Sequence, residues 1–279
     1  MKKIEFYKLE ASGNDFILID AYRIKGKKIN YKAFARKICQ RKNSIGADGL
    51  LVIDKSKKAR FKMRIFNADG SEAEMCGNGS RCAALWAALN CACKGKRKRE
   101  FDFETIAGLI KAKVTPRKNT AKVQMVDPFN LKLNIALAVL GRRVRVNFIN
   151  TGVPHVVVFV QGLAKINVDE IGRAIRFHSK FAPAGANVNF VELMSKDTIS
   201  VRTYERGVEA ETDSCGTGSV AAAIISGFKL KSDLNKFSLK VKTKGKDTLK
   251  IYYSRNKNKV SEVFLEGQAH LVYKGSIQI

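Results

Sequence analysis

The segment Cys76-Gly-Asn-Gly-Ser-Arg-Cys-Ala-Ala84 recurs as Cys215-Gly-Thr-Gly-Ser-Val-Ala-Ala-Ala223, 139 positions later in the chain. In each copy a cysteine and two closely spaced glycines precede a run of small apolar residues. A single match of this kind arises easily by chance, whereas several matches in the same order indicate a duplicated unit.

Three further pairs of segments extend the repeat. Two pairs keep the offset of 139, and the third is offset by 138, which places one extra residue between Glu205 and Cys215 in the second copy. The pairs are Ser12-Gly13 with Thr151-Gly152, Gly46-Ala47-Asp48 with Gly185-Ala186-Asn187, and Met63–Asn67 with Val201–Glu205. Four matched segments in one order predict that the chain consists of two homologous halves.

The same succession of patterns occurs in each half. Alternating or β-branched runs, which are typical of strands, lead to the glycine-flanked cysteine. The Ala-rich, nearly uncharged run after each cysteine predicts a helix that is buried on all sides. The expected strands lie within 61–66, 111–126, 199–204 and 237–253, and the expected buried helices within 82–93 and 220–228.

These elements predict an α+β fold of two pseudo-symmetric domains, each a mixed, largely antiparallel sheet rolled around a central buried helix. We expect the N-terminal half, with Cys76, to comprise residues 1–118 plus 266–279. The C-terminal half, with Cys215, is expected to comprise residues 119–265. A length of 279 residues agrees with two domains of ordinary size.

The composition is that of a folded protein, with 45% hydrophobic residues, 28% charged residues and 4 prolines. Glu5, Lys8 and Glu10 interrupt the first residues before the apolar core of a signal peptide can form. No run of ~20 predominantly apolar residues offers a membrane span. We therefore expect a cytoplasmic protein with no membrane partner, whose 6 cysteines are reduced thiols rather than a disulfide framework.

The net charge of +27 raises the question of nucleic acid binding. The basic residues are spread along the chain, and the densest runs, at 94–99 and 142–145, have no interleaved aromatic residues and no nucleic-acid-binding signature. A solvated basic surface is the favoured interpretation. Such a surface also attracts acidic small molecules.

A cysteine at a strand-to-helix junction lies beside backbone N–H groups that have no partner within the helix. The positive end of the helix dipole stabilises a thiolate there, and the neighbouring glycines let a ligand approach the backbone closely. The N–H groups of Gly77 and Asn78 in one half, and of Gly216 and Thr217 in the other, are expected to hold a carboxylate.

If the two halves face each other across a pseudo-two-fold axis, Cys76 and Cys215 lie on opposite sides of one cleft. Two thiols on opposite faces of a carbon meet the requirement of a two-base epimerisation, because one removes the α-proton and the other delivers a proton to the opposite face. The adjacent carboxylate accepts the carbanion charge, so the reaction needs neither a pyridoxal cofactor nor a metal.

The remaining cysteines and histidines are interpreted as structural. His178 and His270 stand alone in the sequence, so no metal site is predicted. Asp48 is interpreted as a turn cap beside glycine. Four cysteines suit small apolar packing positions in or beside helices: Cys39, Cys82, Cys91 and Cys93.

At the residues around both cysteines the sequence resembles the diaminopimelate epimerase family, pyridoxal-independent enzymes that interconvert LL- and meso-diaminopimelate. The block Arg64–Gly79 is the most specific part of the resemblance, which covers most of the chain. The resemblance implies α-carbon epimerisation of a small diamino dicarboxylate, without a cofactor, in the supply of lysine and peptidoglycan precursors. The matching segments are Ser12–Phe16, Ile45–Leu51, Met63–Cys82, Thr151–His155, Gly185–Glu192 and Val201–Ala222.

The resemblance also implies roles for individual residues. Cys76 and Cys215 are the implied acid–base pair, and His155 and Glu205 influence their protonation. An arginine suits a dicarboxylate substrate because its guanidinium can bind a carboxylate through two parallel hydrogen bonds. The implied substrate contacts come from both halves: Asn14, Asn67, Gly77, Asn78, Asn187, Glu205, Arg206, Gly216 and Thr217.

Two departures from the family pattern bear on specificity. Val153 stands where the family usually has the asparagine of Gly-Asn-Pro-His, and the residue inserted before Cys215 can shift Glu205. A racemase or epimerase of another amino acid, including one similar to proline racemases, therefore stays open. A disulfide redox protein that uses Cys76 and Cys215, and a basic nucleic-acid-binding protein, are alternatives of other classes. The oligomeric state is also open, with a homodimer as one arrangement.

Overall fold

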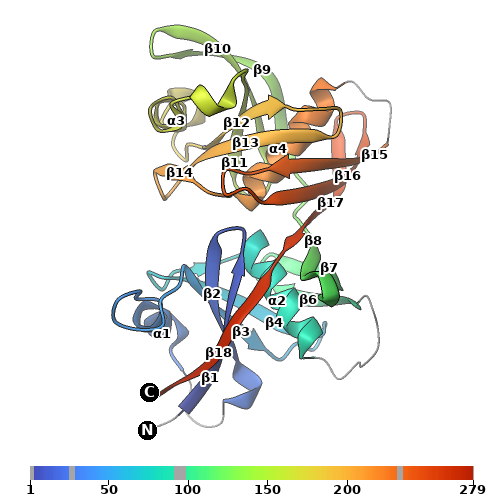
Figure 1. Cartoon of the computed structure of the whole chain (residues 1–279). Coiled ribbons are helices and arrows are strands. Elements are labelled where there is room, and N and C mark those ends of the chain that lie inside the picture. Colours follow the sequence, from blue (N-terminus) through green and yellow to red (C-terminus); the bar gives the residue numbers. More distant parts are fainter. Residues whose placement is uncertain (1–2, 25–28, 91–98, 231–234, 279) are drawn as a thin grey trace. The chain divides into compact units, whose positions relative to one another are not determined.

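The computed structural model describes residues 3–24, 29–90, 99–230 and 235–278. It divides into two compact units, drawn in Figure 1: unit 1 is Met1–Gln124 with Glu266–Ile279, and unit 2 is Met125–Leu265. The division falls slightly later in the chain than the boundary after residue 118 that the sequence suggests. The expectations for Cys91, for Cys93 and for residues 94–98 of the basic run lie outside the described residues.

Unit 1 is a mixed sheet with two helices. Its described strands follow the order β18-β1-β2-β3-β4-β6-β7-β8, with the short β5 paired to β4. Neighbouring strands are antiparallel except in the pairs β2–β3 and β4–β6, whose connections contain α1 and α2. The bounds are β1 Lys3–Ala11, β2 Asn14–Asp20, α1 Tyr31–Ile38, β3 Gly49–Asp54, β4 Lys62–Asn67, β5 Glu72–Ala73, α2 Gly77–Leu89, β6 Arg99–Thr105, β7 Gly108–Thr115, β8 Thr120–Gln124 and β18 His270–Gln278, with 3-10 turns η1 Ala21–Arg23 and η2 Pro116–Lys118.

Unit 2 repeats this arrangement. Its described strands follow the order β9-β10-β11-β12-β13-β15-β16, with β14 paired to β13. The parallel pairs are β11–β12 and β13–β15, whose connections contain α3 and α4. The bounds are β9 Phe129–Val139, β10 Arg142–Asn150, β11 Pro154–Phe159, α3 Val168–Arg176, β12 Asn187–Leu193, β13 Thr198–Glu205, β14 Ala210–Thr212, α4 Gly216–Lys229, β15 Lys236–Lys242, β16 Thr248–Asn256 and β17 Lys259–Gln268, with 3-10 turns η3 Leu163–Lys165 and η4 Ser179–Phe181.

The two units correspond element by element. β1, β2, α1, β3, β4, α2, β6 and β7 of unit 1 match β10, β11, α3, β12, β13, α4, β15 and β16 of unit 2 in order, strand direction and pairing. The predicted duplication and the predicted α+β fold, a mixed sheet around a central helix in each half, are confirmed.

Each unit contains a tight two-residue hairpin turn. In unit 1, Ser12 and Gly13 connect β1 to β2 with φ of 54° and 84°. In unit 2, Leu140 and Gly141 connect β9 to β10 with φ of 48° and 74°. Two-residue loops with positive φ at both positions match the right-handed twist of the strands they join.

The central helices are buried on all sides. Every residue of α2 from Gly77 to Ala88 is buried, and so is every residue of α4 from Gly218 to Gly227. Figure 1 shows the strands of unit 1 around α2 and those of unit 2 around α4. Within the described ranges, no helix combines the length and the apolar composition needed to cross a membrane.

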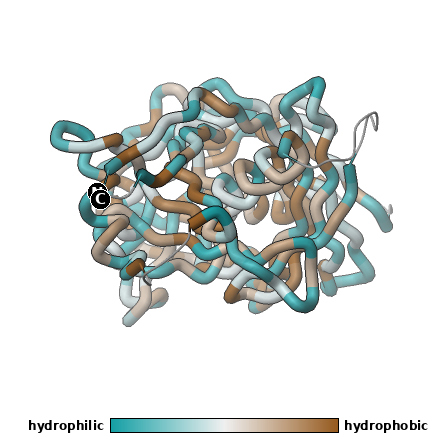
Figure 2. Tube along the Cα trace, turned by 90° about the horizontal axis from the view of Figure 1, so that it is seen from below, coloured by the Kyte–Doolittle hydropathy of each residue, from teal (hydrophilic) through white to brown (hydrophobic). Residues whose placement is uncertain are grey.

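The outer helices cover the opposite face of each sheet. α1 contributes Phe34, Ala35 and Ile38 to a cluster that includes Ile17 and Ile19 of β2. α3 lies on the corresponding cluster of unit 2. Because side chains alternate along a strand, each sheet places one apolar set on its central helix and the other on its outer helix. The alternation of hydrophobic and hydrophilic residues can be followed along the trace in Figure 2.

The packing of α3 on β13 predicts an overpacking penalty at Gly172. A Cβ at this position would lie 2.5 Å from Tyr204 Cβ. We expect Gly172→Ala to lower the free energy of unfolding by about 1–3 kcal/mol, although alanine is the better helix former by about 1 kcal/mol. Urea unfolding followed by circular dichroism measures this change. The control Arg173→Ala, at an exposed position of the same helix, should change stability by no more than about 0.5 kcal/mol; an equal effect of both substitutions would contradict the prediction.

Candidate active site

Cys76 is the N-cap residue of α2. Its backbone is extended, with φ −141° and ψ 121°, and its Sγ accepts a hydrogen bond from the Gly79 N–H at 3.4 Å. The helix begins directly after the cysteine, so the thiol stands where the first N–H groups of the helix are directed. These groups and the helix dipole favour the thiolate form of a half-buried cysteine.

Cys215 occupies the equivalent position at the start of α4. Its backbone is again extended, with φ −115° and ψ 112°, and its Sγ lies 3.5 Å from Thr217 Oγ1. The side chain is 8% exposed. Both sulfurs therefore lie at the N-terminus of a buried helix, one in each unit.

The glycine three residues after each cysteine allows a close approach to the helix. A Cβ at Gly79 would lie 3.2 Å from Leu51 Cδ2, and one at Gly218 would lie 2.3 Å from Asn189 Oδ1. Larger residues at these positions would push the first helical turn away from the sheet. The second glycine of the Cys-Gly-x-Gly motif is thus required by packing as well as by access to the backbone N–H groups.

Two further described cysteines, Cys39 and Cys82, have different surroundings from this pair. Cys39 is buried in the cluster under α1, and burial raises the pKa of its thiol to about 11. Cys82 lies within α2, and complete burial raises the pKa of its thiol further. Both are small buried apolar residues rather than reactive thiols.

A directed chain of hydrogen bonds orders the polar side chains next to Cys76. Arg81 Nη2 donates to Asn78 Oδ1 at 2.5 Å, and Asn78 Nδ2 donates to Asn14 Oδ1 at 2.6 Å. Asn14 Nδ2 in turn donates to Asp48 Oδ2 at 3.1 Å. Each amide thus has a fixed orientation, and each keeps one further N–H for a ligand.

The two ends of this chain are held firmly. Arg81 is fully buried in α2 and also donates to Ser12 Oγ and to the carbonyl of Gln268. At the other end, Arg41 bridges the carboxylates of Asp48 and Asp15. Burial alone would raise the pKa of Asp15, but hydrogen bonds from Arg41 and Lys8 hold it well below its usual range.

Asn67 is the exposed last residue of β4, and the N–H of the following Ala68 donates to the carbonyl of Asp48. Asn67 Nδ2 donates to Ser71 Oγ at 2.9 Å, and its backbone N–H donates to the carbonyl of Ser71. These bonds close the turn between β4 and β5. Glu72, the first residue of β5, forms an ion pair with Arg64, in which Nε and Oε1 are 2.6 Å apart. This carboxylate therefore has a structural role.

His155 is a fully buried, neutral imidazole. Burial lowers its pKa to about 3, with a smaller contribution from the charge of Arg206. Asn189 Oδ1 accepts from Thr203, so its amide nitrogen is the group that lies 3.2 Å from His155 Nδ1. The imidazole nitrogen Nδ1 is therefore the acceptor, and the proton resides on Nε2.

Asn187 joins two segments of unit 2. Its Nδ2 donates to the carbonyl of Pro154 at 3.0 Å, and its Oδ1 accepts from the backbone N–H of Arg206 at 2.9 Å. The guanidinium of Arg206 donates through Nη1 to the carbonyl of Ala184. This bond uses one of the five N–H donors of the guanidinium, and four are left for other acceptors.

Glu205 precedes Arg206 at the end of β13. Burial raises the pKa of this carboxyl, and a hydrogen bond from Thr212 Oγ1 to Oε2 at 2.8 Å offsets part of that effect. The turn that follows is tied back to the strand, because the N–H of Glu209 donates to the Glu205 carbonyl at 2.8 Å.

An ion pair between Arg176 and Glu209 stabilises this turn. Arg176 of α3 donates through Nε and Nη2 to Glu209 Oε1 at 3.2 and 3.1 Å, and the same oxygen accepts from the Gly207 N–H. Arg176 also donates through Nη1 to the Ala184 carbonyl, which is the acceptor of Arg206. The inserted residue of the second repeat thus lies in a turn that Arg176 and Glu209 stabilise.

Within unit 1 the structure joins Asn14 and Asn78 by a hydrogen bond, close to Cys76, and leaves Asn67 at a strand end. Within unit 2, hydrogen bonds and the register of β11 with β12 bring His155, Asn187, Glu205 and Arg206 together. The N-terminus of α4 is tied to the β10–β11 turn, because Thr151 Oγ1 donates to the Thr217 carbonyl.

Sequence reasoning missed several residues that orient the predicted ones. The repeat contained a signal for Asp48, which matches Asn187 at the offset of 139, but Asp48 was interpreted only as a turn cap. The others carry no signal in the repeat. Arg81 and Asn78 are 3 positions apart, whereas Arg176 and Glu209 are 33 positions apart. The residues missed are Arg41, Asp48, Arg81, Arg176, Asn189 and Glu209.

Solved structures share the fold at low sequence identity. A PhzF-family phenazine biosynthesis protein from Bacillus anthracis matches with a TM-score of 0.75 and 17% identity, covering 100% of both chains. A hydroxyproline epimerase from Agrobacterium vitis matches with a TM-score of 0.70 and 14% identity, covering 99% of this chain and 91% of that one. At these identities the likeness concerns the fold alone.

Sequence comparisons identify the family. The diaminopimelate epimerase of Aquifex aeolicus strain VF5 is 45% identical over 282 residues, which cover 98% of each chain. That of Methanothrix thermoacetophila is 43% identical over 289 residues, covering 99% of this chain and 97% of the relative. The family profile "Diaminopimelate epimerase" matches residues 6–130 and 147–272, one stretch in each half. The resemblance seen in the sequence is therefore confirmed, and this chain belongs to the diaminopimelate epimerase family.

Proposed function

We propose that this protein converts LL-diaminopimelate to meso-diaminopimelate by two-base epimerisation at one α-carbon, with Cys76 and Cys215 as the acid–base pair. The observation that carries the proposal is the duplicated placement of a cysteine as the N-cap of each buried central helix. Membership of the family supports the choice of substrate.

The reaction is a balanced transfer of protons. The thiolate of one cysteine removes the α-proton and becomes a thiol, while the thiol of the other delivers its proton to the opposite face of the same carbon and becomes a thiolate. The configuration inverts, and the two sulfurs exchange protonation states. The mechanism requires both sulfurs to reach one α-carbon from opposite sides.

The carbanion is stabilised through the α-carboxylate. As the C–H bond breaks, negative charge moves onto the carboxylate oxygens, where backbone N–H groups at a helix N-terminus are the natural donors. We assign this role to Gly77 and Asn78 on one side and to Gly216 and Thr217 on the other. The polar chain from Arg81 to Asp48 supports it by holding Asn78 and Asn14 in fixed orientations.

Recognition of the distal end of the substrate is assigned mainly to Arg206. Its guanidinium keeps donors for a second carboxylate, and the neighbouring Glu205 can accept from an ammonium group. Asn187 has both ends of its amide engaged with backbone groups, so it acts chiefly by placing Arg206. Val153 offers no hydrogen bond at the position where the family usually has an asparagine. Asn67 completes the proposed set from unit 1.

Loss of either thiol should abolish the reaction. We expect Cys76→Ala and Cys215→Ala each to lower kcat/KM for diaminopimelate by at least about 10³-fold, because each removes one of the two proton-transfer groups. Proton NMR in heavy water measures both epimer formation and deuterium incorporation at the α-carbon. Cys39→Ala is the matched control and should keep activity close to that of the unchanged protein. Exchange that persists in both variants would refute the proposal, and a redox or nucleic-acid-binding protein would show no exchange at all.

His155 should remain uncharged throughout the working pH range. The folded pKa of about 3 lies below the ordinary value of 6.5, so the imidazole stays neutral as the pH falls from 8 to 5. The variant His178→Gln/His270→Gln leaves a single histidine, and nitrogen-15 NMR of that variant should show the Nε2–H tautomer without titration in this interval. An imidazolium signal at pH 6 would contradict the assignment.

The Arg176–Glu209 ion pair should act on substrate binding more than on proton transfer. Because it fixes the turn after Arg206 and shares the Ala184 carbonyl with it, Arg176→Met and Glu209→Gln should raise KM about tenfold and change kcat less than threefold. Steady-state kinetics with each variant measures the split. Arg173→Met, an exposed change on the same helix, serves as the control and should leave both constants unchanged. A fall in kcat with KM unchanged would argue against this positioning role.

A further inference from the structure

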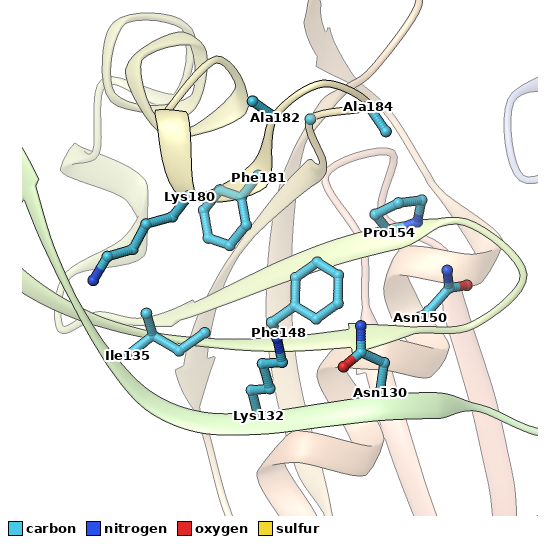
Figure 3. Close-up of a pocket in the computed structure, with 11 residues that line it drawn as sticks. Asn130, Lys132, Ile135, Phe148, Asn150, Pro154, Lys180, Phe181, Ala182 and Ala184 are labelled. Carbon is cyan, nitrogen blue, oxygen red and sulfur yellow. The ribbon is translucent and has the colours of Figure 1, made fainter.

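A cavity of about 400 Å³ lies in unit 2, at the edge of the hydrophobic cluster beneath α3. Its lining side chains come from β9, β10, the first residue of β11 and the chain around η4 (Figure 3). The volume falls within the range of small-molecule sites. None of the residues assigned above to the epimerisation lines it.

The apolar part of the lining is a pair of stacked rings. The centroids of Phe148 and Phe181 are 5.8 Å apart and their planes differ by 9°. Both rings are half-buried, and Ile135 and Pro154 extend the apolar surface on either side, as Figure 3 shows. Such a surface suits a ring or a branched aliphatic group.

The polar part of the lining consists of hydrogen-bond donors. Lys132 and Lys180 contribute ammonium groups, and none of the described residues that line the cavity is a carboxylate. Lys180 Nζ donates to the carbonyl of Ala136 at 2.6 Å, which leaves two of its three N–H donors. Asn150 accepts from the Gly152 N–H through Oδ1, so its remaining polar group is an NH₂ donor.

Two ammonium groups beside an apolar platform select an anion with an apolar body. Among the described lining residues there is neither an arginine, which binds an oxyanion through two parallel bonds, nor the first turn of an α-helix. Among the described residues Lys132 forms no ion pair, so its charge is available to a ligand. We propose that this cavity is a second small-molecule site, which binds a small carboxylate with a ring or branched aliphatic body.

The site is separate from the proposed substrate site but borders it. Ala184 lines the cavity while its carbonyl accepts from Arg206, and Pro154 lines the cavity while its carbonyl accepts from Asn187. A carboxylate added to the protein has two places to bind, and the experiment must distinguish them. The proposal does not depend on epimerase activity.

The test uses two probes with the same apolar body and opposite charge, 3-phenylpropionate and 3-phenylpropylammonium. Calorimetric titration of the whole protein in saturating diaminopimelate should give a Kd of about 1 mM for the carboxylate, the range expected of a small fragment, and binding at least tenfold weaker for the ammonium compound. Equal binding of both probes would overturn the proposal. So would displacement of the carboxylate by diaminopimelate, which would place it in the substrate site.

Variants locate the bound carboxylate. Lys132→Gln/Lys180→Gln should weaken its binding at least tenfold, and Lys132→Gln alone, which keeps the bond from Lys180 to Ala136, should weaken it about threefold or more. The control Lys165→Gln/Lys196→Gln removes the same charge from exposed positions of unit 2 outside the cavity and should leave the Kd unchanged. Equal effects of the two double variants would show that the carboxylate responds only to the net charge of the protein.

Discussion

The structure depends on the burial of one helix inside each sheet. A helix that is apolar on every side can be stable only where strands surround it, and its first N–H groups are then held at a fixed place beside the strand ends. Cys76 and Cys215 cap these two helices, so the position of each thiol follows from the packing of a whole unit. A reactive group on a flexible loop would not be held at a fixed position in this way.

The polar residues beside the helices are ordered by hydrogen bonds of fixed direction. The chain between Arg81 and Asp48 begins at a guanidinium, which can only donate, and ends at a carboxylate, which can only accept. Both intervening amides therefore have one orientation. In unit 2 burial keeps His155 neutral, and the hydrogen bond from Asn189 makes its Nδ1 the acceptor. Preorganised donors of this kind stabilise developing charge without reorganising during the reaction.

The fold and the centre of the site could be predicted from the sequence, whereas most of the residues around that centre could not. Periodicity and the repeated Cys-Gly-x-Gly motif were sufficient for the duplication, the central helices and the junction position of both cysteines, since these are local patterns. The helices nevertheless begin earlier than the Ala-rich runs, at Gly77 and Gly216, because the glycines adopt helical geometry after the capping cysteine. Contacts such as Arg176 with Glu209 could not be predicted, because they join positions 33 residues apart and either residue alone resembles an ordinary surface charge.

The two units differ in how the first parallel pair of strands is linked at its beginning. β2 pairs Phe16 with Gly49, whereas β11 pairs His155 with Asn187. In unit 1 the link runs in both directions, because the Asp48 carboxylate accepts from the Asp15 N–H and the Asp48 N–H donates to the Asp15 carbonyl. In unit 2 Pro154 has no N–H to donate, and the side-chain amide of Asn187 donates to its carbonyl. An amide is therefore suited to this position, because its N–H links the two segments while its oxygen accepts from Arg206, the residue that we assign to the distal carboxylate.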